Sequence, residues 1–462
     1  MKRFFSIIFA VVCCHVCSYA RISTISGVEA TYAGKQVKLM CRMDGIAELN
    51  RTLDVADVDA NGAFSLSVDI DRPIQAFIPG EIVNAFIYLE PGTNYQVGIP
   101  VYQERTLSQK LDPYFKPTDI LLQINDLKKT DLNFKLMEFE DAFDFYSVKH
   151  LVYGTSVDSI FASIGQMREI FSDFKENGFL SDFMENRFLL LLNSSNQIYK
   201  DSMVALLDKR LVDEFNPAFW DIFNNLFDDL IPQLADDRVK YLSFQRVIDE
   251  GNAKMYFMLL TKQLGITNQN LKELVAIKLL YDLLNQPQFD QYKVLDLMQR
   301  ISQGIASEQH RVLLQQIVNT ASSNYIGSPA PDFEVTTING QKKKFSDFKG
   351  KFLYLNFENS VIDQTQKDLE ILLRIQNDYK KDLTVLNVGL YDSKELVTRL
   401  SQRYNEKMVF LLADDSDLVK ELYAIKSIPA FFLIDKDGNF LMTRGAEPTD
   451  ELRMLMQKIF KP

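Results

Sequence analysis

The chain has 462 residues, a formal net charge of −11, a hydrophobic content of 47% and an aromatic content of 12%. This length and composition are sufficient for two or three domains with buried cores. The excess of acidic residues argues against nucleic-acid binding, which requires a basic face.

The first twenty residues have the organisation of a secretory signal peptide. A basic start at residues 1–3 precedes an apolar stretch over 4–16 that is too short to span a bilayer, and small residues follow at 18–20. We predict cleavage after Ala20 and a periplasmic or secreted protein. A lipoprotein is the less favoured alternative, because no cysteine of this segment follows the small residue that lipidation requires. These cysteines are Cys13, Cys14 and Cys17.

Cleavage leaves Cys41 as the only cysteine of the mature chain, so no internal disulfide is expected. Cys41 alternates with Val37, Leu39 and Met43 at the spacing of inward-facing strand residues. We therefore expect a buried thiol rather than a reactive one.

Residues 21–104 are predicted to form a small β-sandwich-like domain. Hydrophobic and polar residues alternate over 37–41, 64–68 and 85–89, as in strands with one buried face. Pairs with a strong turn preference separate these segments, namely Asn61-Gly62, Pro79-Gly80 and Pro91-Gly92.

The sequence Asp57-x-Asp59-x-Asn61-Gly62 also matches the start of a calcium-binding loop. Such a loop requires a bidentate acid at its twelfth position, where this chain has Val68, and it requires flanking helices instead of strands. We therefore interpret the segment as a tight hairpin turn and predict no metal site there.

Residues 105–322 are predicted to form an all-helical domain of seven to nine helices. Leucine and phenylalanine recur at intervals of three and four, for example over 188–192 and 271–280, and we interpret them as core residues. His150 and His310 have no acidic or cysteine residue at ligand spacing. Neither a metal nor another cofactor is therefore predicted.

Residues 323–462 alternate strand and helix signals. An Asn339-Gly340 turn precedes apolar strands over 352–357 and 383–390, each followed by a helical segment. A second hairpin turns at Asp437-Gly438 before a final helix. This alternation predicts an α/β domain with parallel strands.

Ser360 and Asp363 have the spacing of a capping box at the start of the first of these helices. We expect Ser360 to accept hydrogen bonds from the first turn of the helix. The alternative is a nucleophilic serine or threonine, which needs a nearby base. No histidine follows His310 to serve as that base.

Three phrases of the last segment resemble the TlpA-like and AhpC/TSA branch of the thioredoxin superfamily. They are Pro329-Ala330-Pro331-Asp332-Phe333, Ser346-Asp347-Phe348-Lys349-Gly350-Lys351 and Ile428-Pro429-Ala430. Each phrase is short, but their order and spacing together are specific. The resemblance implies a thioredoxin-like fold over 323–462. Residues 21–104 in turn resemble the β domain that precedes such a fold in many secreted members of this branch.

In this family a strand ending in Asn-Phe leads into Trp-Ala-x-Trp-Cys-x-x-Cys. Placing Asn356-Phe357 on that phrase puts Ile362 and Thr365 at the two cysteine positions and Val361 at the preceding tryptophan. Neither Ile362 nor Thr365 supplies the thiolate that disulfide exchange requires. The resemblance thus implies the fold without its redox chemistry.

The family also has a cis-proline beside this loop, which holds an extended peptide through backbone hydrogen bonds, and Pro429 matches it. The resemblance implies a binding site at the former active-site loop, composed of Glu358, Asn359, Ser360, Ile362, Thr365, Ile428 and Pro429. The alternative is that the proline only shapes the edge of the sheet.

The predicted fold class is multidomain, α+β and α/β, with an N-terminal β-sandwich-like domain, an all-α middle domain and a C-terminal thioredoxin-like fold. We expect a secreted protein that binds or scaffolds proteins or extended peptides in the cell envelope without exchanging disulfides. No nucleic-acid partner and no membrane-spanning segment after signal cleavage are expected.

Two alternatives remain open. One is a non-catalytic partner within a thiol-disulfide oxidoreductase or antioxidant system. The other is an unrelated enzyme that uses an interdomain cleft, with Glu358 as its acid.

Overall fold

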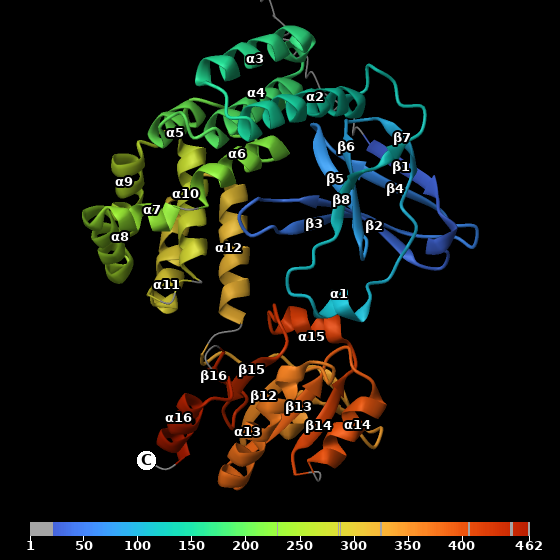
Figure 1. The fold of residues 1–462 in the computed structure, drawn as a ribbon, viewed down its shortest axis with the longest axis vertical. Coiled ribbons are helices and arrows are strands. Elements are labelled where there is room, and N and C mark those ends of the chain that lie inside the picture. The colour runs from blue at the N-terminus through green and yellow to red at the C-terminus, as the bar shows by residue number, and fades with distance from the viewer. Residues whose placement is uncertain are drawn as a thin grey trace, which may run out of the picture. The chain divides into compact units, whose positions relative to one another are not determined.

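A computed structural model of the protein describes residues 22–228, 230–284, 286, 288–323, 326–404, 407–443 and 447–460 (Figure 1). The predicted signal peptide, its cleavage site and Cys13, Cys14 and Cys17 lie outside these residues. None of the helices within them is long and apolar enough to cross a membrane. The chain divides into two compact units.

The first unit comprises the described residues up to Tyr102, Thr118–Gln197 and Asp213–Ile222. It contains two sheets, with strand orders β4-β1-β7-β9 and β3-β2-β5-β6-β8. The strands are β1 (Ile22–Val28), β2 (Gln36–Arg42), β3 (Asn50–Asp57), β4 (Ala63–Asp69), β5 (Ile74–Ile78), β6 (Val83–Leu89), β7 (Asn94–Gly98), β8 (Thr118–Leu121) and β9 (Gln123–Ile124). Residues of both sheets, among them Leu39, Leu66 and Ile87, form one buried cluster. The three strands predicted from alternation are confirmed.

The predictions of a buried Cys41 thiol and of a tight turn at Asp59 are confirmed. Cys41 is 4% exposed, and burial raises the pKa of its thiol. In the turn between β3 and β4, Oδ1 of Asp59 accepts hydrogen bonds from the N–H groups of Asn61 and Ala63 at 2.8 and 2.9 Å. Gly62 has φ +87° and a Cβ there would meet Glu29 backbone atoms at 2.5 Å, so this turn requires glycine.

The helices of the first unit begin later than the sequence indicated. Residues 107–111 form a short helix of the second unit, and the first unit resumes with β8, which pairs with β6, and β9, which pairs with β7. The expectation of helix from residue 105 was therefore wrong for this stretch, because the short strands had no turn pair or long alternation to mark them. The helices are α2 (Leu132–Ser147), a π-helical turn (Val148–Val152), α3 (Val157–Ile170), α4 (Gly178–Ser194) and the first part of α6 (Pro217–Phe227).

Arg187 joins three of these helices. Its guanidinium donates to Glu140 of α2 at 2.8 Å and to Asp221 of α6 at 2.6 Å, and it lies 5.2 Å from the centre of the Phe183 ring. The Arg187 side chain is 19% exposed and that of Glu140 29%, whereas that of Asp221 is 45% exposed, so the pair with Glu140 is the less screened of the two. Arg187 thus connects α4 to both α2 and α6.

The second unit comprises Gln103–Pro117, Ile198–Val212 and the described residues from Phe223 onward. Its first helices are α1 (Leu107–Leu111), α5 (Lys200–Asp208), α7 (Leu230–Asp236), α8 (Arg238–Glu250), α9 (Ala253–Leu264), α10 (Gln269–Leu283), α11 (Gln291–Ile301) and α12 (Glu308–Ser323). Leu271, Leu274 and Leu280 of α10 are fully buried, as predicted. From residue 105 to Ser323 the structure describes twelve α-helices, α1 to α12, more than the seven to nine expected, because several are short.

His310 has an acidic partner that its sequence spacing did not reveal. Nδ1 of His310 lies 2.7 Å from Oε2 of Glu273, and both side chains are fully buried. Glu273 also accepts hydrogen bonds from the N–H groups of Ala306 and Ser307 and from Gln269. Thirty-seven residues separate the pair in sequence, and the packing of α10 against α12 brings them together.

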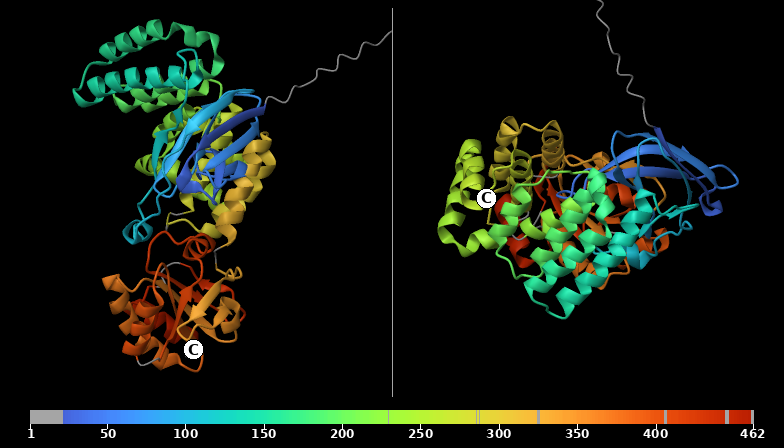
Figure 2. Two further views of the ribbon diagram at one scale, coloured as in Figure 1. Left: turned by 90° about the vertical axis from the view of Figure 1, so that its right-hand side faces the viewer. Right: turned by 90° about the horizontal axis from the view of Figure 1, so that it is seen from above.

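The last strands and helices, coloured orange to red in Figure 2, form a sheet of order β11-β10-β14-β13-β12-β15-β16 with flanking helices. The strands are β10 (Glu334–Thr337), β11 (Lys342–Lys344), β12 (Phe352–Glu358), β13 (Leu383–Gly389), β14 (Val409–Ala413), β15 (Ala430–Ile434) and β16 (Phe440–Met442). The helices are α13 (Asp363–Tyr379), α14 (Lys394–Arg403), α15 (Ser416–Leu422) and α16 (Asp450–Phe460).

Strands β12, β13 and β14 are parallel, as the alternation of strands and helices predicted. Leu355 of β12 points into the core on one face of the sheet, and Tyr354 points into the core on the other face. Both predicted hairpins are present, whereas strand β14 was not predicted. The protein is thus a mixed α/β protein with substantial helical content.

Replacing Glu273 by Gln should lower stability at pH 7 by about 1–3 kcal/mol, because its hydrogen-bonding groups are buried. Burial alone would raise the pKa of Glu273, but the hydrogen bonds from Ala306, Gln269, His310 and Ser307 lower it. The stability that the ionised Glu273 carboxylate contributes is therefore complete above the ordinary pKa of 4.5 and is lost as the pH falls through its lowered pKa. Urea unfolding followed by circular dichroism should show that the difference in stability between wild type and Glu273→Gln becomes smaller in acid.

Glu308→Gln provides the control, because the side chain of Glu308 is 76% exposed. This variant should unfold close to the wild type at every pH. An equal loss for both variants would mean that the buried Glu273 contributes no more than a surface charge.

Candidate functional site

The residues predicted to form the site meet at the carboxyl end of β12. The chain leaves β12 after Glu358, passes through a loop at 359–362 and enters α13 at Asp363. Phe357 of β12 pairs with Ala430 of β15, so the segment just before β15, with its cis Ile428-Pro429 bond, lies at the same end of the sheet. The structure therefore brings both predicted parts of the site together.

Ser360 does not cap α13, and that prediction was wrong. Its hydroxyl donates to Oδ1 of Asp392 at 2.6 Å, and its N–H donates to Oδ2 of the same carboxylate at 2.8 Å. Ile362 is the N-cap residue of α13, without a side-chain cap. Ser360 lies two residues before the N-cap, so its oxygen is not at the position that accepts hydrogen bonds from the first turn of the helix.

Asn359 and Thr365 hold the loop from within. The Asn359 side chain is fully buried, and its Nδ2 donates to the carbonyl oxygens of Leu390 and Tyr391 at 2.7 and 3.3 Å. The Thr365 hydroxyl, also buried, donates to the Asn359 carbonyl oxygen at 3.1 Å. These side chains tie the start of α13 to the loop after β13.

Glu358 lies in the interior. It is 1% exposed, and Nδ2 of Asn356 donates to its Oε2 at 3.2 Å. Burial, and secondarily the nearby charge of Asp392, raises the pKa of Glu358 to about 8. Because of this raised pKa, Glu358 is mostly protonated at neutral pH. Among the described residues Oδ1 of its neighbour Asn356 has no hydrogen-bond partner.

Four of the predicted residues, Ser360, Ile362, Ile428 and Pro429, are half-buried. Val361, which was not predicted as a site residue, is 54% exposed beside them. A ligand at this loop would touch these side chains, whereas Glu358, Asn359 and Thr365 shape the loop beneath them. The assignment of all seven residues to a binding site remains a prediction.

The sequence did not point to the loop after β13, which supplies Asp392 and Tyr391. Tyr391 has φ +52°, and its hydroxyl donates to Oδ1 of Asp417 at 2.7 Å. Arg105 donates to the same oxygen at 3.2 Å, and Lys110 lies 5.7 Å from the centre of the Tyr391 ring. Since the carboxyl ends of parallel strands meet at one edge of a sheet, the position of Asp392 after a predicted strand was the available signal.

A surface cavity of about 410 Å³ lies elsewhere in the same sheet. Phe333 and Glu334, at the start of β10, line it together with Asp414, Leu418 and other residues, and no predicted site residue does. Strands β14 and β13 separate β10 from β12. The cavity is therefore distinct from the loop at the start of α13.

Comparison with known proteins matches the same end of the chain. Residues 326–440 match the model of the AhpC/TSA family. Thiol-disulfide oxidoreductase ResA of Bacillus thuringiensis is 28% identical over 136 residues, which cover 29% of this chain and 78% of that protein. ResA of Geobacillus kaustophilus is 29% identical over 136 residues, with 28% and 78% covered.

Two solved structures from Bacteroides are also similar. A putative thiol-disulfide oxidoreductase from Bacteroides vulgatus is 27% identical, with a TM-score of 0.28, and covers 30% of this chain and 99% of its own. A thioredoxin-like protein from Bacteroides caccae is 16% identical, with a TM-score of 0.37, and covers 58% of this chain and 96% of its own.

The family model covers the part of the chain that contains the entry phrase at 329–333, the turn before β12 and Ile428-Pro429-Ala430. Residues 326–440 therefore belong to the AhpC/TSA branch of the thioredoxin superfamily.

Proposed function

We propose that this is a secreted or periplasmic binding protein in which an N-terminal β-sandwich-like domain and an all-helical middle domain precede a thioredoxin-like domain without disulfide-exchange activity. The observation that carries the proposal is the absence of any cysteine after Cys41 in a chain whose last domain belongs to this family. The ResA relatives are named thiol-disulfide oxidoreductases, and that activity is not transferred to this chain.

The chemistry of the two replaced positions supports this proposal. Disulfide exchange needs a thiolate, usually placed at the start of a helix, where the N–H groups lower its pKa. Ile362 stands at the N-cap position of α13 but its side chain has no lone pair, and the hydroxyl of Thr365 is buried and bonded to a backbone carbonyl. No nucleophile is available at either position.

The proposed ligand is an extended segment of a protein or peptide. The exposed side chain of Val361 and the half-buried Ile428 and Pro429 offer an apolar contact surface at the end of the sheet. Because Asn359 and Ser360 already bind the loop after β13, the surface is preorganised and loses little conformational entropy on binding.

Burial disfavours the alternative of an enzyme with Glu358 as its acid. A general acid must come within hydrogen-bond distance of its substrate, but Glu358 is 1% exposed. A non-catalytic partner in a thiol-redox system would use the same binding surface. The two functions differ in which proteins the immobilised chain would capture.

The purified protein should not reduce insulin disulfides in the presence of a dithiol donor, because no thiolate lies at the start of α13. A turbidity assay measures this directly. The double variant I362C/T365C is the matched comparison, since it restores both sulfur positions in the same loop. Wild-type turnover above the buffer rate would refute the proposal.

Val361→Asp should abolish capture of envelope peptides by the immobilised protein, because the carboxylate would have to leave water at an apolar contact. Met454→Asp is the control, because Met454 is 57% exposed on α16, outside the loop. Mass spectrometry of the captured peptides measures the effect. Equal capture by both variants would place the binding surface away from α13.

Glu358→Gln should stabilise the protein at pH 8–9 by about 4–5 kcal/mol and change little at pH 5, since the pKa of Glu358 rises from 4.5 to about 8 and each unit corresponds to about 1.4 kcal/mol. The folded protein holds the proton up to a pKa of about 8, so wild-type stability falls as the pH rises from the ordinary value of 4.5 towards 8. Glutamine retains the shape of the protonated acid without titrating.

Urea midpoints between pH 5 and pH 9 measure this effect. Glu395→Gln, at an exposed position in the first turn of α14, should keep the wild-type pH dependence. If Glu358→Gln also keeps it, Glu358 does not titrate in this range.

A further inference from the structure

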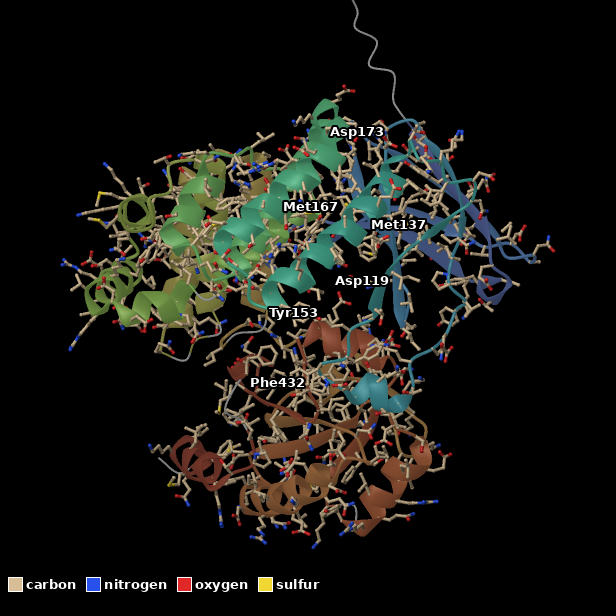
Figure 3. All side chains as sticks on the ribbon, turned by 45° about the horizontal axis from the view of Figure 1, so that its top comes forward. Asp119, Met137, Tyr153, Met167, Asp173 and Phe432 are labelled. Carbon is tan, nitrogen blue, oxygen red and sulfur yellow. The ribbon has the colours of Figure 1, made fainter. Side chains whose placement is uncertain are left out.

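A short segment packs with the second unit, although its neighbours in sequence on both sides belong to the first. Residues 103–117, called here the strap, are this segment, and they contain α1. A capping box between Thr106 and Gln109 starts the helix. Figure 1 labels α1 beside α15, and Figure 3 shows the side chains of α1, in teal, next to those of the last domain.

The strap contacts α15 and the loop after β13 through charged side chains. Nη2 of Arg105 donates to Oδ1 of Asp417 at 3.2 Å, and Nζ of Lys420 donates to the carbonyl oxygen of Lys110 at 3.4 Å. The ammonium groups of Lys110 and Lys420 lie 5.7 and 5.5 Å from the centre of the Tyr391 ring. The Arg105 side chain is 23% exposed and that of Asp417 59%, so the strap is held by a modest ion pair that can be released.

The strap meets the loop after β13 at a strained residue. Tyr391 has φ +52°, a left-handed conformation that is unfavourable for a residue with a Cβ and persists only where its surroundings impose it. Its N–H donates to Oγ of Ser416 at 2.8 Å, and its hydroxyl donates to Oδ1 of Asp417 at 2.7 Å. Arg105 donates to that same oxygen and therefore holds the acceptor on which Tyr391 depends.

The backbone at Tyr391 determines where the next residue, Asp392, lies. The Asp392 carboxylate accepts hydrogen bonds from the hydroxyl and the N–H of Ser360 at 2.6 and 2.8 Å. The carbonyl oxygen of Tyr391 itself accepts a hydrogen bond from Asn359 at 3.3 Å. A continuous series of direct contacts thus leads from the strap to the loop at 359–362, which bears the proposed ligand surface.

We propose that Arg105 is a positioning residue for the loop at 359–362, because it holds the loop after β13 in the conformation that orders the ligand surface. The role of Arg105 in binding rests on the proposed function, since that surface is the proposed peptide site. When the strap is released, Tyr391 can relax and Asp392 no longer presents both oxygens to Ser360. The ligand surface therefore has a held state of higher affinity and a released state of lower affinity.

Hydrogen exchange measured by mass spectrometry tests the positioning without a ligand. In the chain without its predicted signal peptide, Arg105→Gln should raise the exchange rate of peptides that cover 357–364 by about twofold to fivefold, the range expected for a partly exposed ion pair. Arg105→Lys keeps the charge and should exchange more slowly than Arg105→Gln. Arg453→Gln is the matched control, because Arg453 donates to Asp378 at the same 3.2 Å but at the opposite end of α13.

Binding of an extended polypeptide tests the consequence for the ligand surface. The probe is fluorescently labelled lactalbumin that has been reduced and carboxymethylated, and anisotropy measures its affinity. Arg105→Gln should weaken binding by about twofold to fivefold at an unchanged melting temperature. Asp417→Asn should also weaken it, and the double variant R105Q/D417N should bind no more weakly than Asp417→Asn, because Arg105 acts through Asp417.

Unchanged exchange over 357–364 in Arg105→Gln would overturn the proposal. So would losses of affinity that multiply in the double variant, or faster exchange with full affinity for the probe. If the wild type does not bind the probe, or if Val361→Asp binds it equally well, the proposed binding function is wrong, and the exchange rates still decide whether Arg105 positions the loop.

Discussion

The burial of the carboxyl end of β12 is the constraint on which the candidate site depends. Packing on both faces of the sheet leaves no water for the polar side chains at its end, Asn356, Glu358 and Asn359. Burying a polar group is costly in free energy unless the group finds a partner or gives up its charge. Asn359 bonds to the carbonyl groups after β13, and Glu358 remains protonated at neutral pH. The loop before α13 is shaped by these requirements.

The same arrangement limits what the domain can do. A helix start at the end of a central strand is suited to activating a nucleophile, because its N–H groups stabilise negative charge. Here that position is occupied by Ile362, and the Ser360 hydroxyl is bonded to Asp392. The chain has no cysteine at this helix start, so the proposed binding function rests on shape and apolar contact.

The two units present different surfaces. In the second unit, the loop beside α13 is small and stabilised by hydrogen bonds to the loop after β13. In the first unit, the turn between α2 and α3 exposes Phe145, Val152 and Tyr153 to 67%, 71% and 77%. Both ring nitrogens of His150 form hydrogen bonds with hydroxyl groups, of Thr155 and Ser163, and these bonds hold the turn against α3.

Local sequence determined the hairpins at Asn339-Gly340 and Asp437-Gly438, the alternating strands and the buried leucines of α10. Turn chemistry and hydrophobic periodicity act between near neighbours, so they can be recognised without the fold. The family motifs also identified the last domain and the loop where its cysteines are missing.

Only the tertiary structure decided which distant groups meet. It placed Asp392 against Ser360, Glu273 against His310, and strands β8 and β9 beside β6 and β7. It also separated Glu358 and Asn359, which lie inside, from Val361 and Pro429, which reach the surface. Partner choice and burial depend on packing between segments that are far apart in the chain, and no local pattern encodes them.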